Sequence, residues 1–432
     1  MKSAVIGLGV EGKKALNSLL KYGWDVYASD LNVNIDIDDL PVSSRDADVS
    51  PSQSRISFSK DRLSIDLGFN NKEEIESCDA IALSPSIWGS AVAEEFRKSG
   101  KLLCDVKNRH RSIFTIGVTG TNGKTTTTSM IKEILENAGR KVLTGGNGGG
   151  GFDGYYDLIL DANENDYDVL LIEVCDMTVG FCDYCFDFDI VALTNMGNDH
   201  MNVHGSMEGY KESLKDFFKD KTVFINDDQI YKDEFKESAD MTVECAASDY
   251  DLKLFGGFNK RNAGIAENIS RYIDENFFKI DETIIQDTLE GFMPVKGRLE
   301  VLKLNDCDIY IGKTDNSDAL KTVLDEVDFK TLFIGTPRHD ESHRFEILDE
   351  AVKSKPEVIV LFPGLEDTLD QAVYRLHGLD FSGRIERASN LDEIIGYVAE
   401  FSHEPSLFIG GNGQENIIKI QERLEEICKN LN

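Results

Sequence analysis

The sequence predicts an α/β protein made of three consecutive α/β domains. A glycine turn follows an apolar run within the first ten residues, and a second glycine turn follows another apolar run near residue 118. From about residue 297 onward, short apolar runs alternate with amphipathic stretches. A chain of 432 residues is also too long for one ordinary core. We therefore expect domains at residues 1–111, 112–297 and 298–432.

The first domain begins with a predicted βαβ unit. Residues 2–9 have the pattern of a strand and a turn, residues 12–21 that of an amphipathic helix, and residues 26–30 that of a second strand. Residues 81–86 predict a later strand that ends in a turn, where Ser84 and Ser86 lie. The domain is expected to be Rossmann-like.

Three glycines in the first turn have a spacing that suits a bound diphosphate. Gly7, Gly9 and Gly12 follow the G-x-G-x-x-G pattern, and Asp30 ends the second predicted strand. Such a turn accepts the diphosphate of NAD, but also that of a nucleotide linked to another group. An NAD-dependent dehydrogenase is therefore one alternative, although it leaves the second glycine loop without a function.

That second loop predicts ATP binding. Its backbone N–H groups can surround a phosphate, the lysine adds a positive charge, and the next hydroxyl can bind Mg²⁺. Val118 stands where the general P-loop pattern has glycine, but a predicted strand at 112–116 and a predicted helix at 127–138 flank the loop. The expected phosphate-binding residues are Gly120, Thr121, Asn122, Gly123, Lys124, Thr125 and Thr126.

Two later apolar runs in the second domain end in possible metal ligands. Residues 169–174 contain Glu173 near their end, and residues 190–195 lead to His200. Buried parallel strands bring such groups to one edge of a sheet, so both are candidate magnesium ligands. The glycine-rich stretch 145–151 is either a plain connecting loop or a loop that covers substrate.

The third domain is predicted from its apolar strands at 331–335, 358–362 and 407–410. An amphipathic helix is expected from about residue 415 to 429.

Composition narrows the class of partners. The formal net charge of −32 repels phosphate backbones and anionic lipids, so we expect neither nucleic acid nor a membrane as partner. No run of about 18 apolar residues occurs, and a cytoplasmic protein is expected. Eight scattered cysteines give no disulfide framework, and Cys182 and Cys185 form a single C-x-x-C whose aromatic neighbours favour packing over metal binding.

Five motifs in this order resemble those of the Mur ligase family, which forms amide bonds on nucleotide-linked cell-wall peptides. They are the phosphate loop 119–126, the histidine segment 195–208, the asparagine segment 257–262, the arginine segment 294–300 and the glycine segment 411–415. The resemblance covers nearly the whole chain and implies the three-domain architecture of that family.

The resemblance also implies roles for individual residues. ATP would phosphorylate a substrate carboxylate, and an amine would attack the acyl phosphate. Lys124, His200 and Arg298 would be catalytic, and Asn262 and Arg298 would contact the nucleotide. Thr125, Glu173 and His200 would hold Mg²⁺. The first domain would bind a UDP-linked peptide through Gly7, Gly9, Gly12, Asp30, Ser84 and Ser86.

Several positions depart from the family pattern. Many members carry a modified lysine four residues after Tyr210, where this chain has Leu214, and Lys215 would lie about 100° round the helix. In the segment 312–320, either Asp315 or Asp318 replaces the expected aspartate and histidine. Arg338 and Asp340 resemble a site for the incoming amino acid.

Among members of the family, the chain most resembles the pseudomurein peptide ligases of methanogens. We expect a monomer that takes a UDP-linked peptide and a free amino acid. A related ligase of another acyl substrate, such as a folate polyglutamylating or cofactor-amidating enzyme, is an alternative. A nucleotide sensor without catalysis is another.

Overall fold

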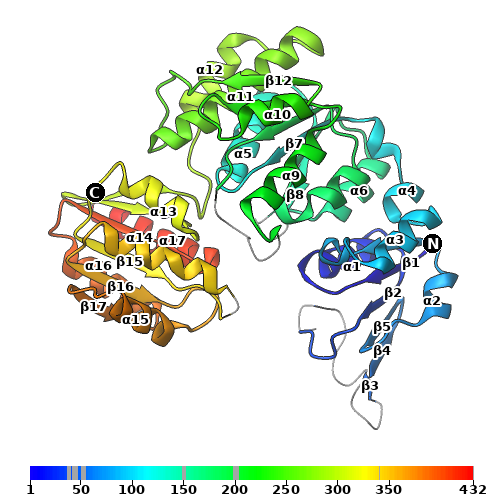
Figure 1. Ribbon diagram of the computed structural model, residues 1–432, viewed down its shortest axis with the longest axis horizontal. Coiled ribbons are helices and arrows are strands. Elements are labelled where there is room, and N and C mark those ends of the chain that lie inside the picture. Colours follow the sequence, from blue (N-terminus) through cyan, green and yellow to red (C-terminus); the bar gives the residue numbers. More distant parts are fainter. Residues whose placement is uncertain are drawn as a thin grey trace.

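The computed structural model describes residues 1–36, 40, 47–49, 55–147, 152–197, 204–339 and 341–431, and all statements of structure below concern these residues. The chain forms three lobes, each built on a six-stranded sheet, with the central lobe between the other two (Figure 1). Each sheet draws its strands from one of the ranges 1–111, 112–297 and 298–432, and we keep these ranges as the proposed domain division.

The first sheet has the strand order β3-β4-β5-β2-β1-β6. Strands β5, β2, β1 and β6 are parallel, and β3 and β4 extend the sheet as an antiparallel edge. The elements are β1 (Lys2–Ile6), α1 (Val10–Lys21), β2 (Asp25–Asp30), β3 (Ala47–Val49), β4 (Ile56–Lys60), β5 (Leu63–Leu67), α2 (Lys72–Ser77), β6 (Ala80–Leu83), η2 (Pro85–Ile87), α3 (Ala91–Ser99), α4 (Leu103–Val106) and η3 (Arg109–Ser112).

The central sheet is parallel throughout, in the order β12-β11-β10-β7-β9-β8. The elements are β7 (Phe114–Thr119), α5 (Lys124–Asn137), β8 (Val142–Gly146), α6 (Tyr155–Glu164), β9 (Val169–Glu173), η5 (Asp176–Thr178), α7 (Val179–Cys185), β10 (Ile190–Leu193), α9 (Met207–Phe218), β11 (Thr222–Asn226), α10 (Lys232–Ser238), β12 (Met241–Cys245), α11 (Gly257–Asn276) and α12 (Glu282–Gly291).

The third sheet has the order β13-β14-β18-β15-β16-β17, with only the β13–β14 pair antiparallel. The elements are β13 (Glu300–Leu304), β14 (Cys307–Ile311), α13 (Ser317–Leu324), β15 (Thr331–Gly335), η6 (Ser342–Phe345), α14 (Glu346–Lys353), β16 (Val358–Phe362), α15 (Leu369–Gly378), β17 (Arg384–Arg387), α16 (Leu391–Phe401), β18 (Ser406–Gly411) and α17 (Gln414–Leu431). The predicted three-domain α/β fold is therefore confirmed.

The core joins the first two lobes more closely than the third. One continuous buried cluster includes side chains of the first sheet together with α6, α7 and α9, which cover one face of the central sheet. Helices α5, α11 and α12 cover the opposite face in a second cluster. The third lobe has its own two clusters, one on each face of its sheet. Because both faces of the sheets are covered, inner strands such as β10 and β16 consist of apolar residues alone.

Two local predictions were wrong. The strand predicted at 112–116 begins only at Phe114, because the Ser112 hydroxyl donates to Arg109 O and closes the short helix η3. In the glycine-rich stretch 145–151, the first two glycines are not loop but the end of edge strand β8. Among the helices that the structure describes, none has the length and apolar character needed to span a membrane.

Candidate active site

The loop between β7 and α5 can form only because it contains glycine at two positions. Gly120 and Gly123 have φ values of +127° and +83°. A Cβ atom on Gly123 would lie 2.5 Å from Asn262 Oδ1, and one on Gly120 would lie 2.7 Å from Asn195 O. The loop therefore packs against the asparagine segment and against the end of β10, and the first turn of α5 points its N–H groups into the loop.

The predicted phosphate-binding residues lie together around one cavity of about 480 Å³. Lys124 is folded over the loop, where its Nζ donates to Gly120 O at 2.6 Å and to Thr121 O at 2.9 Å. Anionic phosphate oxygens would compete for the same ammonium, as in other glycine-rich phosphate loops. The loop residues that line the cavity are Thr121, Asn122, Gly123, Lys124, Thr125 and Thr126.

The Thr125 hydroxyl and Glu173 form a pair suited to a divalent cation. Thr125 Oγ1 lies 2.7 Å from Glu173 Oε2, and Glu173 is only 1% exposed at the end of β9. Asn147 Nδ2 donates to the other carboxylate oxygen, Oε1, at 3.1 Å. A buried carboxylate beside a hydroxyl at the phosphate loop provides the oxygen ligands that Mg²⁺ prefers. The sequence analysis missed Asn147, although it follows the glycines of β8.

Arg298 brings a second positive charge to this place from the start of the third lobe. Its Nη2 donates to Thr125 Oγ1 at 2.5 Å, and its carbonyl accepts from Gln421 Nε2 at 3.1 Å. Arg298 Nε is buried and makes no hydrogen bond with the described residues. An unsatisfied guanidinium N–H beside the phosphate loop fits an anionic oxygen as its partner.

Buried asparagines line another part of the cavity. Asn262 is 4% exposed, and its Nδ2 donates to Asn259 Oδ1 at 3.2 Å. Asn226 donates to Thr194 O at 2.6 Å, whereas its Oδ1 is buried and has no hydrogen-bond partner among the described residues. Leu254 and Phe258 add apolar surface to the same lining. Amide groups beside apolar side chains are suited to a nucleobase.

The candidate substrate residues of the first lobe lie near one another at the carboxyl ends of β1, β2 and β6. Its parallel strands have the order β5-β2-β1-β6. Strand β2 lies on one side of β1 and β6 lies on the other, so the strand order switches sides at β1. Ligands usually bind at such a switch point, beyond the carboxyl ends of the strands. Asp30 Oδ2 accepts from Leu8 N at 2.7 Å, and Ser84 Oγ lies 2.9 Å from Ser86 Oγ. Gly7 and Gly9 lie in the turn from β1 into α1, and Gly12 lies in the first turn of α1, where a Cβ would meet Gly7 O.

The remaining candidate site residues are His200, Arg338 and Asp340. His200 and Asp340 lie outside the described residues. Arg338 is exposed beyond the end of β15 and does not line the central cavity. Its neighbour His339 contacts Glu366 and Gln371 in the same lobe. The structure therefore does not bring Arg338 to the phosphate loop.

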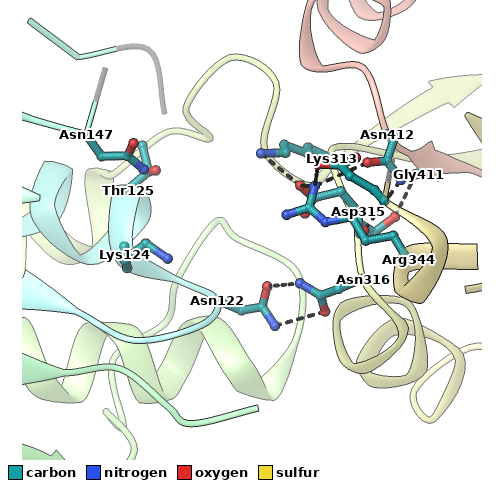
Figure 2. A network of polar contacts seen from close by, with 12 residues as sticks. Asn122, Lys124, Thr125, Asn147, Lys313, Asp315, Asn316, Arg344, Gly411 and Asn412 are labelled. Atoms are coloured by element: carbon teal, nitrogen blue, oxygen red, sulfur yellow. Dashed lines mark hydrogen bonds and ion pairs between the residues drawn. The ribbon is translucent and has the colours of Figure 1, made fainter. Parts of the chain in front are cut away.

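A different set of residues faces the phosphate loop from the third lobe. We call Lys313, Asp315, Arg344 and Asn412 the charge cluster (Figure 2). Asp315 Oδ2 lies 3.1 Å from Lys313 Nζ and 3.0 Å from Arg344 Nη1, and Arg344 also donates to Asn412 Oδ1 at 3.3 Å. Burial would raise the pKa of Asp315, but the two cations outweigh this and lower the pKa well below its ordinary value.

The two acids of the segment 312–320 lie in different surroundings. Asp315 lies inside the cluster, whereas Asp318 faces the central lobe, where a Cβ on Gly197 would lie 2.5 Å from Asp318 Oδ2. Sequence spacing could not reveal the cluster, because its members follow three strands that are far apart in the chain. Strands β14, β18 and β15 are neighbours in the sheet, and their carboxyl ends meet at one edge.

In helix α9, the position at which many Mur ligases have a modified lysine is occupied by Leu214. Leu214 is fully buried, and Lys215 forms an ion pair with Glu212 at 3.0 Å rather than lining the cavity.

Cys182 and Cys185 are buried thiols, and Cys185 Sγ lies 3.2 Å from Cys104 Sγ of the first lobe. Among the described residues no group of three or more His, Cys, Asp or Glu is arranged to hold a metal ion.

Known proteins are similar to this chain in sequence. Residues 118–298 match the family model described as the Mur ligase middle domain. A UDP-N-acetylmuramoylalanine--D-glutamate ligase from Clostridioides difficile (strain 630) is 28% identical over 331 residues, which cover 68% of this chain and 70% of that protein.

Two solved structures are similar in fold. A pseudomurein peptide ligase type C from Methanothermus fervidus has a TM-score of 0.57 at 18% identity and covers 98% of this chain and 99% of its own. E. coli FolC in complex with DHPP and ADP has a TM-score of 0.60 at 15% identity and covers 75% of this chain and 92% of its own.

The fold and the site define an ATP-dependent ligase: a phosphate loop, a hydroxyl–carboxylate pair and an arginine from the next lobe surround one cavity. Phosphoryl transfer needs this kind of charge neutralisation more than it needs covalent chemistry by the protein. The chain is similar to Mur ligases over most of its length, and its residues 118–298 match the middle domain of that family.

Proposed function

We propose that the protein adds one amino acid to a UDP-linked peptide precursor of a cell wall, and that this precursor belongs to pseudomurein. The observation that carries the proposal is the meeting of three groups at one cavity. The phosphate loop comes from the central lobe and the other two from the third lobe. The loop, Arg298 and the charged members of the cluster all line that cavity. The strand ends at Gly7 and Ser84 in the first lobe are the proposed binding place of the UDP carrier.

In the first step, a carboxylate oxygen of the peptide attacks the γ-phosphorus of ATP. The bond between the γ-phosphorus and the β–γ bridging oxygen breaks, ADP leaves, and an acyl phosphate remains. Lys124 and Arg298 offset the negative charge on the transferred group. A first Mg²⁺ held by Thr125 and Glu173, and a second held by His200, would supply additional charge neutralisation.

In the second step, the amine of the incoming amino acid attacks the acyl carbon, and phosphate leaves as the amide bond forms. We propose the charge cluster as the place that holds this amino acid, instead of Arg338 and Asp340. Arg344 and Lys313 suit its carboxylate, because both are cations at the cavity and Arg344 is only 10% exposed. Asp315 suits its ammonium group.

Two alternatives are tested by the same experiment. One is a ligase of another acyl substrate, for which the likeness in fold to FolC is a reason. The other is a sensor that binds nucleotide without catalysis. A sensor has no use for an acceptor, so release of phosphate that depends on an amino acid separates it from a ligase.

The experiment measures phosphate release from ATP and Mg²⁺ with a UDP-linked glutamyl peptide, screened against single amino acids, with the product mass recorded in parallel. We expect release to rise with one amino acid and the peptide to gain that residue's mass. Lys124→Ala serves as the inactive control. Flat release across the panel, with ATP still bound, contradicts the proposed substrate, and a folate-type donor then becomes the next substrate to test.

A further inference from the structure

We propose that Asn316 is a positioning residue that fixes the charge cluster relative to the phosphate loop. Its side chain and that of Asn122 form a reciprocal pair: Asn316 Nδ2 donates to Asn122 Oδ1 at 3.0 Å, and Asn122 Nδ2 donates to Asn316 Oδ1 at 3.3 Å (Figure 2). The two residues are 194 positions apart and belong to different lobes. The role in catalysis rests on the proposed function.

The third-lobe end of the pair is fixed by a helix cap. Asn316 Oδ1 accepts from Ala319 N at 2.8 Å and thereby caps α13. This bond determines which atom of the Asn316 amide is oxygen, so its Nδ2 must face Asn122. Asn316 is 3% exposed and has little freedom to turn away.

The central end is equally constrained, through the backbone of the loop. Asn122 N donates to Asn195 Oδ1 at 3.0 Å, and Asn122 O accepts from Asn195 Nδ2 at 2.7 Å and from the Thr194 hydroxyl at 2.6 Å. The pair therefore connects two rigid parts, the phosphate loop and the start of α13. Its groups are neutral amides, so the hydrogen bonds between them do not depend on protonation.

This connection lies directly beside the charge cluster. Asn316 follows Asp315 in sequence, and their Cα atoms are only about 3.8 Å apart. A displacement of Asn316 therefore also displaces Asp315. Attack on an acyl phosphate requires the reacting atoms to approach within about 3–3.5 Å, and an error of about 1 Å can lower the rate about 100-fold. A fixed distance between phosphate loop and charge cluster thus favours the second step, in which the amine attacks.

The test compares Asn316→Ser with Asn390→Ser in the full chain. Serine caps helices about as well as asparagine does, but it is too short to reach Asn122. Asn390 caps α16 in the same lobe by accepting from Glu393 N at 3.0 Å, so it is a matched control. An equal melting temperature of the two variants shows that the cap is retained.

The first readout is hydrogen–deuterium exchange without ligands. For Asn316→Ser we expect the peptide covering residues 119–124 to exchange about threefold faster or more, with no change in Asn390→Ser. Equal exchange in wild type and Asn316→Ser overturns the proposal. Because this readout needs no substrate, it stands even if the proposed reaction is wrong.

The second readout separates the two chemical steps. We expect Asn316→Ser to retain ATP affinity and to form acyl phosphate, trapped with hydroxylamine, at the wild-type rate. Amide formation should fall about 10- to 100-fold. Equal losses in both steps, or no loss, contradict a positioning role in the second step. Wild-type protein that forms neither product refutes the proposed function instead, and exchange alone then decides the role of Asn316.

Discussion

Thr125 Oγ1 lies 2.7 Å from Glu173 Oε2, and Arg298 Nη2 donates to the same hydroxyl at 2.5 Å. One hydroxyl group thus connects the phosphate loop, strand β9 and the third lobe. A side chain that contacts both a buried carboxylate and a guanidinium group lies where charge must be balanced during phosphoryl transfer. The predictions below follow from this arrangement and from the charge cluster.

Replacing Glu173 by glutamine should weaken the effect of Mg²⁺ on nucleotide binding. The amide is neutral and a poorer ligand, so we expect the gain in ATP affinity on adding Mg²⁺ to fall about tenfold or more. Titration calorimetry with and without Mg²⁺ measures this gain. Glu133→Gln, an exposed change on helix α5, which follows the phosphate loop, is the control. An unchanged gain would exclude Glu173 as a ligand.

Replacing Arg298 by alanine should slow catalysis more than it weakens ATP binding. The guanidinium group is expected to stabilise charge that develops in the transition state, so kcat should fall about 100- to 1000-fold. Arg387→Ala is a suitable control, because that arginine pairs with Asp370 at the surface, away from the cavity. Steady-state kinetics with saturating ATP measure kcat. A kcat near the wild-type value would contradict this role of Arg298.

Much of this fold could be predicted from the sequence, and the reason is visible in particular strands. Strands β15 and β16 have the predicted bounds, because strands buried on both faces are continuous apolar runs. The antiparallel strands β4 and β14 were not predicted. Strand β14 alternates buried with partly buried residues over only five positions, and β4 has a single buried residue, so both give a weaker signal.

The site was predictable only where its residues are close in sequence. The phosphate loop is one continuous motif, so its members could be named together. The charge cluster is assembled from the ends of β14, β15 and β18, and only the strand order brings these ends together. Arg338 was expected at the site because residues 338–340 resemble a family site for the amino acid, but its side chain is exposed and does not line the cavity.

Replacing Asp315 by asparagine should destabilise the third lobe. Lys313 and Arg344 would be left near each other without their shared carboxylate, which costs about 3 kcal/mol of unfolding free energy for a pair this buried. Urea denaturation at pH 7 measures the loss. Asp370→Asn, at the exposed pair with Arg387, should cost at most about 1 kcal/mol.

The stability difference between wild type and Asp315→Asn should depend on pH. The pKa of Asp315 is lowered in the folded protein, so its contribution is complete above the unfolded value of about 3.9 and is lost as the pH falls toward the lowered value. The gap in unfolding free energy should be constant from pH 5 to pH 8 and shrink below about pH 4. A gap that widens on acidification would contradict the ion-pair account.

The cysteines should behave as structural thiols. Seven of the eight are buried, and Cys428 is partly exposed. Burial is the main reason that the pKa of Cys175 is raised to about 12 and that of Cys307 to about 11. In the native protein at pH 8, we expect at most one thiol to react quickly with Ellman's reagent, and all eight in denaturant. Rapid reaction of both Cys182 and Cys185 would instead support a redox pair.

The central claim is that ligation proceeds through an acyl phosphate, and oxygen transfer tests it most directly. The donor peptide is prepared with ¹⁸O in its reacting carboxylate and incubated with ATP, Mg²⁺ and the amino acid identified by the screen. If the carboxylate attacks the γ-phosphorus, each released phosphate carries one oxygen from the peptide, and mass spectrometry will find ¹⁸O in phosphate in step with amide formation. Amide formation with unlabelled phosphate would contradict the account.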